Sequence, residues 1–136
     1  MAHLETYLRL LTRWQKRINL VGGRSLADPW RRHFLDSAQL LPLLPKGTQS
    51  LVDLGSGAGF PGLVLGVLGV PRVHLVESDA RKCAFLREAA RETGVSVEIH
   101  TARIENLTPW PVDVVVSRAL APLSRLLLLA HPSWIL

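Results

Sequence analysis

The chain has 136 residues, of which 48% are hydrophobic and 20% charged, and its mean hydropathy is +0.21. These values are typical of a folded globular domain and exclude a disordered tail, a collagen-like repeat and a coiled coil. The longest apolar stretch, Phe60 to Val70, has about eleven residues, whereas a transmembrane helix needs about twenty. Because the N-terminal segment also lacks a signal-peptide cleavage site, we expect a soluble, cytoplasmic protein.

Positive charge is concentrated in the first part of the chain. Residues 1–50 hold eight Lys and Arg against three acidic residues, whereas residues 51–136 hold eight of each. A basic front segment on a neutral body suggests a surface for a polyanion. The alternative is a solvated helix face that is basic by chance.

The N-terminal elements are predicted to be helical. Apolar residues recur at three- and four-residue steps from Leu4 to Ile18, which predicts an amphipathic helix whose other face carries Arg and Lys. An N-cap before Pro29 starts a second helix, predicted from Pro29 to Leu44. We therefore expect a basic helical extension over residues 1–48, followed by a second unit over residues 49–136.

From residue 50 the pattern changes to short apolar runs that alternate with helical segments. The runs predict strands at Ser50–Leu54, Arg72–Val76, Val95–His100 and Val112–Val116. Helices are predicted at Pro61–Leu68, Asp79–Thr93 and Pro122–Ala130. Strands that are apolar almost throughout and separated by helices indicate an α/β fold, with a parallel sheet and helices on both faces.

The C-terminal part of the sheet is expected to be incomplete. A further strand begins at Trp134–Leu136, and the chain stops within that apolar run. We expect a fragment or a shortened reading frame in which the last strands are missing. The chain alone is then expected to be marginally stable and prone to self-association, because helix Pro122–Ala130 and a sheet edge lack cover.

A glycine-rich turn follows the first predicted strand. Gly55, Gly57 and Gly59 permit positive φ angles and a close approach of the backbone to a ligand. In an open parallel sheet, ligands bind beyond the carboxyl ends of the strands. We expect a nucleoside-type cofactor there; the alternative is a tight turn with no ligand.

The charges near this turn indicate which cofactor it holds. The turn lacks the Gly-Lys-Ser/Thr of a phosphate-binding loop, and Asp53 places a carboxylate where a pyrophosphate would be repelled. S-adenosyl-L-methionine carries a sulfonium and an ammonium and no phosphate, so the acidic group favours it. Glu77, at the end of the second strand, is predicted to accept the ribose hydroxyls. A nicotinamide-dependent oxidoreductase is the disfavoured alternative.

Several other side chains are assigned structural roles. Cys83 is predicted to be buried, and because it has no Cys or His at metal-ligand spacing, no metal site is predicted. Asp79 is the predicted N-cap of the helix that follows it. Core packing is predicted for the four tryptophans, which are Trp14, Trp30, Trp110 and Trp134.

Three segments together resemble a known family. Arg32–Ser37, Val52–Gly62 and Val116–Ala119 are similar to the ribosomal RNA small-subunit methyltransferase G family, also called glucose-inhibited division protein B, and the resemblance extends from about Tyr7 to His131. It implies a class I, Rossmann-like methyltransferase that moves a methyl group from S-adenosyl-L-methionine to N7 of a guanine in 16S small-subunit ribosomal RNA. The alternative is an RNA- or cofactor-binding fragment of that fold without turnover.

The resemblance also implies roles for single residues. Gly55 and Phe60 would line the cofactor site, Ile104 and Glu105 would flank the adenine, and Arg118 would close the site. The full predicted cofactor set is Asp53, Gly55, Gly57, Gly59, Phe60, Glu77, Ile104, Glu105 and Arg118. For Arg118, a contact with the substrate or a structural salt bridge is the alternative.

RNA contacts are predicted in the basic front segment, at Arg13, Arg17, Arg31, Arg32 and His33. For His33 the alternative is a satisfied structural histidine. No catalytic acid or base is assigned, because guanine N7 already carries a free lone pair and attack requires only alignment. The expected partner is 16S ribosomal RNA or the small ribosomal subunit, without a membrane or a metal; the oligomeric state is not predicted.

Overall fold

The structure is a computed structural model that describes residues 2–18 and 33–117. Its helices are α1 (Ala2–Gln15), α2 (Leu35–Ala38), α3 (Gly62–Val67) and α4 (Ala80–Thr93), with 3₁₀ helices η3 (Leu41–Leu43) and η4 (Ile104–Asn106). Its strands are β1 (Ser50–Leu54), β2 (Arg72–Glu77), β3 (Val97–Thr101) and β4 (Val114–Val116).

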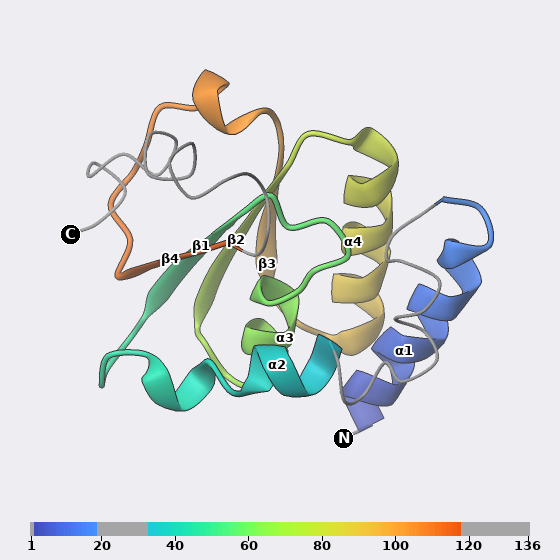
Figure 1. The fold of residues 1–136 in the computed structure, drawn as a ribbon, viewed down its shortest axis with the longest axis horizontal. Coiled ribbons are helices and arrows are strands. Elements are labelled where there is room, and N and C mark those ends of the chain that lie inside the picture. The colour runs from blue at the N-terminus through green and yellow to red at the C-terminus, as the bar shows by residue number, and fades with distance from the viewer. Residues whose placement is uncertain (1, 19–32, 118–136) are drawn as a thin grey trace.

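The four strands form one parallel sheet in the order β3-β2-β1-β4 (Figure 1). The chain moves outward from β1 through β2 to β3 and then returns to the other side of β1, which places a topological switch between β1 and β4. Open α/β sheets bind ligands at such a switch, beyond the carboxyl ends of the strands. The predicted α/β fold is confirmed, and the glycine-rich turn after β1 lies at this switch.

Alternate residues of each strand point to opposite faces of the sheet, as the pleat requires. One face, here called the helix face, is covered by α3 and α4, with α1 packed on these two helices, and it holds the larger core, with fully buried Leu51, Leu75 and Phe85. The other, here called the loop face, holds a smaller core that includes Val52, Ile104, Val112 and partly buried Trp110. All four α-helices of the described ranges belong to the helix side, and the predicted helix 122–130 lies outside those ranges.

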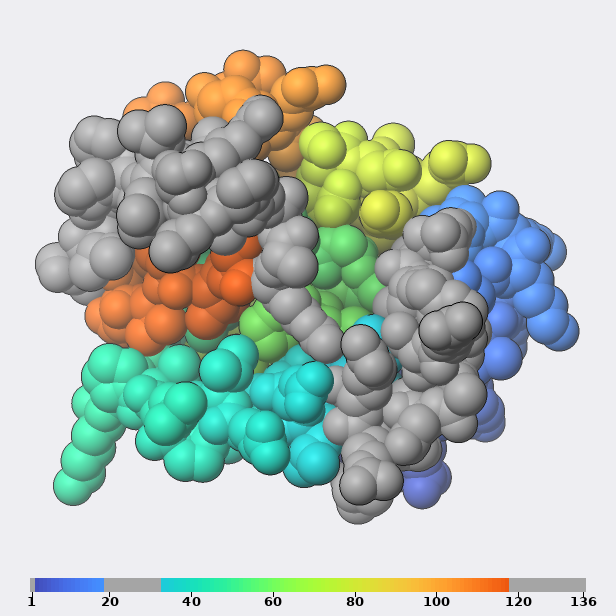
Figure 2. Space-filling view, in the orientation of Figure 1, coloured from blue at the N-terminus to red at the C-terminus, as the bar shows by residue number. Residues whose placement is uncertain are grey.

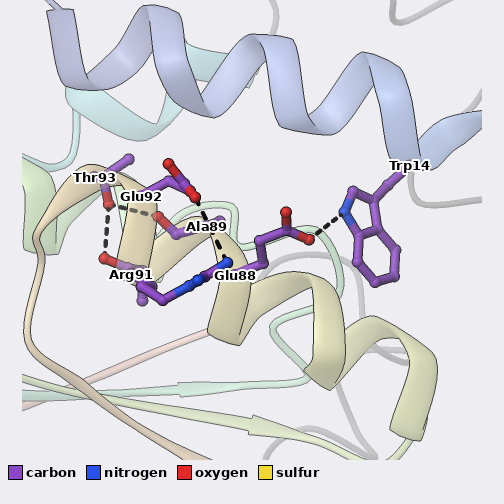
Figure 3. Close-up of polar contacts among 7 residues, drawn as sticks. Trp14, Glu88, Ala89, Arg91, Glu92 and Thr93 are labelled. Carbon is purple, nitrogen blue, oxygen red and sulfur yellow. Dashed lines mark hydrogen bonds and ion pairs between the residues drawn. The ribbon is translucent and has the colours of Figure 1, made fainter.

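Helix α1 packs directly on α4, and Figure 1 shows the two side by side. In the space-filling view, α1 in blue adjoins the yellow-green surface of α4 (Figure 2). The Trp14 ring lies 5.8 Å from that of Phe85, and its Nε1 donates to Glu88 Oε2 at 2.9 Å (Figure 3). The core role predicted for Trp14 is confirmed, and α1 shares one core with the sheet.

The second predicted helix is wrong as a continuous element. Within its described part, α2 ends at Ala38 and is followed by a turn and by η3, which contains Pro42. Proline lacks the N–H that an α-helix uses, and its ring clashes with the carbonyl four residues earlier. The start of that helix and the strand at 134–136 lie outside the described residues, as do Trp30 and Trp134.

The remaining element boundaries differ from the prediction for local reasons. Asp79 caps α4 by accepting from Arg81 N and Lys82 N at 2.8 and 3.2 Å, which confirms its predicted role. Val95 was predicted as a strand residue, but its N–H donates to Ala90 O in the C-terminal cap of α4, so β3 begins later.

Strand β4 is shorter than predicted because the side chain of Asp113 interrupts the regular pairing with β1. Asp113 Oδ2 accepts from Gln49 N and Ser50 N at 2.7 and 3.1 Å, and Asp113 N donates to Ser50 Oγ at 3.0 Å. The two backbone hydrogen bonds hold the pKa of the Asp113 carboxyl below its ordinary value. Regular pairing with β1 therefore starts at Val114.

Candidate functional site

The glycine-rich loop joins the carboxyl end of β1 to α3. Gly55 N and Ser56 N both donate to Val76 O, at 2.8 and 2.9 Å, so the start of the loop is tied to β2. Gly55, Gly57 and Gly59 have φ angles of 80°, 55° and 94°. All three angles lie in the left-handed region, which the glycines in the sequence pattern had led us to expect.

Two glycines of this region have contrasting surroundings. A Cβ on Gly62 would lie 2.6 Å from both Asp53 Oδ2 and Leu75 Cδ2, so only glycine lets α3 approach the sheet this closely. A Cβ on Gly57 would meet no atom within 4 Å among the described residues. The loop is therefore packed tightly at its helix end and open at Gly57.

Asp53 lies beneath the loop on the helix face and is fully buried. Its Oδ2 accepts from Gly62 N at 2.9 Å at the start of α3, while its Oδ1 has no hydrogen-bond partner among the described residues. Burial raises the pKa of the Asp53 carboxyl to about 7, and the Gly62 hydrogen bond partly opposes this. Contact of this carboxylate with a cofactor stays a prediction.

Glu77, the last residue of β2, connects the loop to the start of α4. Its Oε1 accepts from Gly57 N at 2.9 Å and its Oε2 accepts from Asp79 N at 2.7 Å. An ionised carboxylate offers about four lone-pair sites, so both oxygens retain acceptor capacity. The side chain is thus held in place with capacity for hydroxyl donors, and the predicted ribose contact remains a prediction.

The ends of β3 and β4 reach the same edge of the sheet. Ala102 N donates to Glu77 O at 3.1 Å, and the chain then enters η4, which carries buried Ile104 and exposed Glu105. Ser117 Oγ donates to Leu54 O at 3.0 Å, so β4 also ends beside the loop. The predicted site residue that follows, Arg118, lies outside the described residues.

An aromatic cluster supports the loop from the helix side. Phe60 is 6% exposed; its ring stacks on His33 at 4.8 Å and meets Tyr7 edge-on at 5.4 Å. The Tyr7 hydroxyl donates to Ala58 O within the loop. This role of Tyr7 was not predicted from the sequence, although a phenol on the apolar face of the first helix was an available signal.

The predicted RNA contacts are placed differently from one another. Arg13 and Arg17 are exposed on α1 and the turn after it, together with Arg9 and Lys16. His33 is 7% exposed and stacked on Phe60, which favours its structural alternative. The remaining two predicted contacts, Arg31 and Arg32, lie outside the described residues.

The lone cysteine lies behind Glu77 in the core. Cys83 Sγ donates to Glu77 O at 3.2 Å, and burial raises the pKa of this thiol. Its predicted burial is confirmed.

Every helix within residues 2–18 and 33–117 is too short or too polar to span a membrane.

Comparison with known families gives a match over almost the whole chain. The family model described as GidB, rRNA small subunit methyltransferase G, matches residues 1–134. A protein of that name from Rhodospirillum rubrum is 66% identical over 97% of this chain and 66% of its own length. One from Paramagnetospirillum magneticum is 60% identical over 97% of this chain and 64% of its own length. The chain thus spans slightly less than two thirds of these relatives.

Solved structures share the fold at low sequence identity. A coclaurine N-methyltransferase bound to its ligands aligns with a TM-score of 0.61 and 17% identity, over 99% of this chain and 50% of that one. The Pyrococcus abyssi tRNA (uracil-54, C5)-methyltransferase aligns with a TM-score of 0.56 and 21% identity, over 74% and 23%. These likenesses confirm the predicted Rossmann-like fold of class I methyltransferases.

Proposed function

The chain belongs to the rRNA small subunit methyltransferase G family. From this membership we propose that the protein transfers a methyl group from S-adenosyl-L-methionine to N7 of a guanine in 16S ribosomal RNA, in the cytoplasm. One observation of the structure carries this proposal. The glycine-rich loop lies at the topological switch of the sheet, and the Glu77 carboxylate is fixed at its edge. This arrangement suits a nucleoside cofactor without phosphates.

The residues at the loop fit the chemistry of this cofactor. Glu77 offers free lone pairs for two ribose hydroxyls, and the open space at Gly57 leaves room for a ligand against the backbone. The apolar side chain of Ile104 and the exposed carboxylate of Glu105 would flank the adenine. The acidic groups Asp53 and Glu77 would attract the cationic part of the cofactor and would repel a pyrophosphate.

In the proposed reaction, the role of the chain is to position the cofactor and the guanine. The cofactor, when bound, supplies an electrophilic methyl group. Guanine N7 has a lone pair at neutral pH, so no residue of the chain needs to remove a proton. Alignment alone can contribute several kcal/mol to lowering a barrier of this kind, and the fixed loop and Glu77 provide a rigid frame for it.

Binding of RNA is assigned to the basic surface of α1. Arg9, Arg13, Lys16 and Arg17 are exposed there, and each phosphate that they neutralise would release counterions. Because the Tyr7 hydroxyl bonds the glycine-rich loop, this surface and the cofactor loop are held in one packed unit. Arg31 and Arg32, which lie outside the described residues, belong to the same proposed RNA surface.

Cofactor binding is tested by calorimetry with S-adenosylhomocysteine and, separately, with NAD. Losing a hydrogen bond to a charged acceptor costs about 1.5–3 kcal/mol of binding free energy, so Glu77→Ala should weaken the binding of S-adenosylhomocysteine at least tenfold. Glu92→Ala is the matched control, because Glu92 is an exposed carboxylate that pairs only with Arg91 among the ion pairs of the described residues. Tighter binding of NAD, or an unchanged affinity in Glu77→Ala, would refute this assignment.

Methyl transfer is tested on naked 16S RNA and on small ribosomal subunits with the protein that contains this chain. Changing Arg13, Arg17, Arg31 and Arg32 to Ser should flatten the salt dependence of RNA binding and leave S-adenosylhomocysteine binding intact. An unchanged salt slope would place the RNA surface elsewhere. Cofactor binding without methyl transfer to either substrate would favour the non-catalytic alternative.

A further inference from the structure

Three metal-ligating side chains meet on the loop face of the sheet. His74 lies in β2, and Glu98 and His100 lie in β3. In the parallel register His74 is opposite Glu98, and Val76 is opposite His100, so the three side chains emerge from the same face of two hydrogen-bonded strands. They are brought together by the sheet, from positions far apart along the chain.

The distances between their donor atoms suit a single small cation. His74 Nδ1 is 3.2 Å from His100 Nε2 and 3.2 Å from Glu98 Oε2, and His100 Nε2 is 3.8 Å from Glu98 Oε2. Bonds of about 2.0–2.1 Å in a tetrahedral zinc site place neighbouring ligand atoms about 3.3 Å apart. The cluster therefore has nearly the spacing of three corners of a tetrahedron.

Hydrogen bonding alone leaves this arrangement only partly satisfied. A neutral imidazole carries one N–H, and His74 Nδ1 faces two partners at the same distance of 3.2 Å. The third distance, 3.8 Å between His100 Nε2 and Glu98 Oε2, is too long for a hydrogen bond. A proton on His74 Nδ1 is therefore shared between two acceptors, and without it two lone pairs face each other across the His74–Glu98 contact, whereas one cation would accept a lone pair from each atom.

The surroundings hold the two rings in place and leave one side open. The His74 and His100 rings stack at 5.5 Å, and the Trp110 ring lies 5.0 and 4.7 Å from them. The side chains of His74 and His100 are 16% and 26% exposed, whereas that of Glu98 is 71% exposed. Solvent can therefore reach the cluster from the Glu98 side and supply a fourth ligand.

We propose that His74, Glu98 and His100 form a binding site for a divalent transition metal of the zinc type, with its fourth position taken by water. Imidazole and carboxylate ligands in this combination favour such ions over Mg²⁺, which prefers oxygen ligands and octahedral geometry. The bound ion would clamp β2 to β3 beneath Trp110. The site does not use the glycine-rich loop or Glu77, so it stands independently of the proposed methyl transfer.

The test is a calorimetric titration of metal-free, untagged protein with Zn²⁺, with Co²⁺ as a spectroscopic probe and Mg²⁺ as the hard-cation control. We expect one equivalent of Zn²⁺ to bind, tetrahedral Co²⁺ absorption in the visible range, and no heat with Mg²⁺. Zn²⁺ should also raise the melting temperature, because it binds only the assembled cluster.

Variants separate this site from adventitious binding to other histidines. Glu98→Gln should weaken Zn²⁺ binding at least tenfold. Because the Glu98 side chain is largely exposed, this substitution should leave the fold intact. His100→Ala should abolish the Co²⁺ absorption, with circular dichroism as the check on folding. His3→Ala, in an exposed histidine of α1, is the matched control and should bind as wild type. Unchanged Zn²⁺ affinity in both cluster variants, or no binding by wild type, would reduce the cluster to a hydrogen-bonded network and overturn the proposal.

Discussion

The two faces of the sheet are built from the same four strands but differ in what they bury. The helix face packs a large aromatic and aliphatic core around Tyr7, Phe85 and Leu75. The loop face has a small aliphatic core and continues into the His74, His100 and Trp110 stack. The two faces therefore have different roles. The helix face packs against the glycine-rich loop and holds it in place, whereas the loop face leaves polar side chains within reach of solvent.

A buried carboxylate sharpens this contrast. Asp53 on the helix face is enclosed completely and bonds the start of α3, whereas Glu98 on the loop face is mostly in solvent. Enclosure raises the pKa of Asp53 to about 7, because a charge in the core lacks solvation. The helix face therefore gains tight packing and carries an acidic group that titrates near neutral pH.

The largest expected effect comes from removing a core side chain on each face. Phe85→Ala on the helix face should lower the free energy of unfolding by about 3–5 kcal/mol, because the ring is fully buried against Tyr7 and Trp14. Val112→Ala on the loop face removes fewer buried carbons and should cost about 2 kcal/mol. Urea denaturation measures both, and equal losses would contradict the stated difference between the faces.

The second prediction concerns the pH dependence of stability through Asp53. Its pKa rises from an ordinary 3.8 to about 7 on folding, so the folded state binds more protons between these values. Its contribution to stability is therefore full below about pH 4 and is lost as the pH rises towards 7, by up to about 4 kcal/mol.

Asp53→Asn tests this pH dependence, because it keeps an oxygen acceptor for Gly62 N and removes the titration. Urea unfolding at pH 5 and pH 8 should show wild type losing stability relative to the variant at the higher pH. A constant difference between the two proteins at both values would show that Asp53 titrates normally.

The third prediction compares two glycines of the site. Gly62→Ala forces a Cβ against Asp53 and Leu75 and should destabilise the protein by about 1–3 kcal/mol, with weaker S-adenosylhomocysteine binding. Gly57→Ala meets open space, so only its positive φ opposes the change, at about 1 kcal/mol. Thermal melting of both variants checks the order of the two stability losses, while calorimetry measures S-adenosylhomocysteine affinity in Gly62→Ala. A larger loss of stability in Gly57→Ala would contradict the predicted order.

The smallest effect is expected from one hydroxyl. Tyr7→Phe removes the hydrogen bond to Ala58 O and should cost about 1 kcal/mol, together with a modest loss of cofactor affinity. Thr12→Val is the matched control, since it also removes a hydroxyl that bonds a backbone carbonyl, but on the exposed side of α1. Equal effects of the two variants on S-adenosylhomocysteine affinity would show that the Tyr7 hydrogen bond to the loop does not support cofactor binding.

The amino-acid sequence alone determined the local elements that rest on short-range chemistry. Ser50–Leu54 is a strand because an apolar run precedes a glycine turn, and α4 begins after Asp79 because its carboxylate caps the first turn. The prediction of one helix from Pro29 to Leu44 was wrong, because it rested on the signals at the start of the helix and did not weigh Pro42, which lies in η3. The position of Glu77 at the sheet edge also followed from the strand pattern.

Only the tertiary structure decided which distant residues meet. The alternation along a strand fixes which residues share a face, but which residues of β2 and β3 lie opposite each other is seen only once the two strands pair in the sheet. His74 and His100, 26 positions apart, therefore form a cluster that no spacing rule predicts. The same holds for Tyr7 and Ala58, which meet because α1 packs on the core and the helix face closes over the loop.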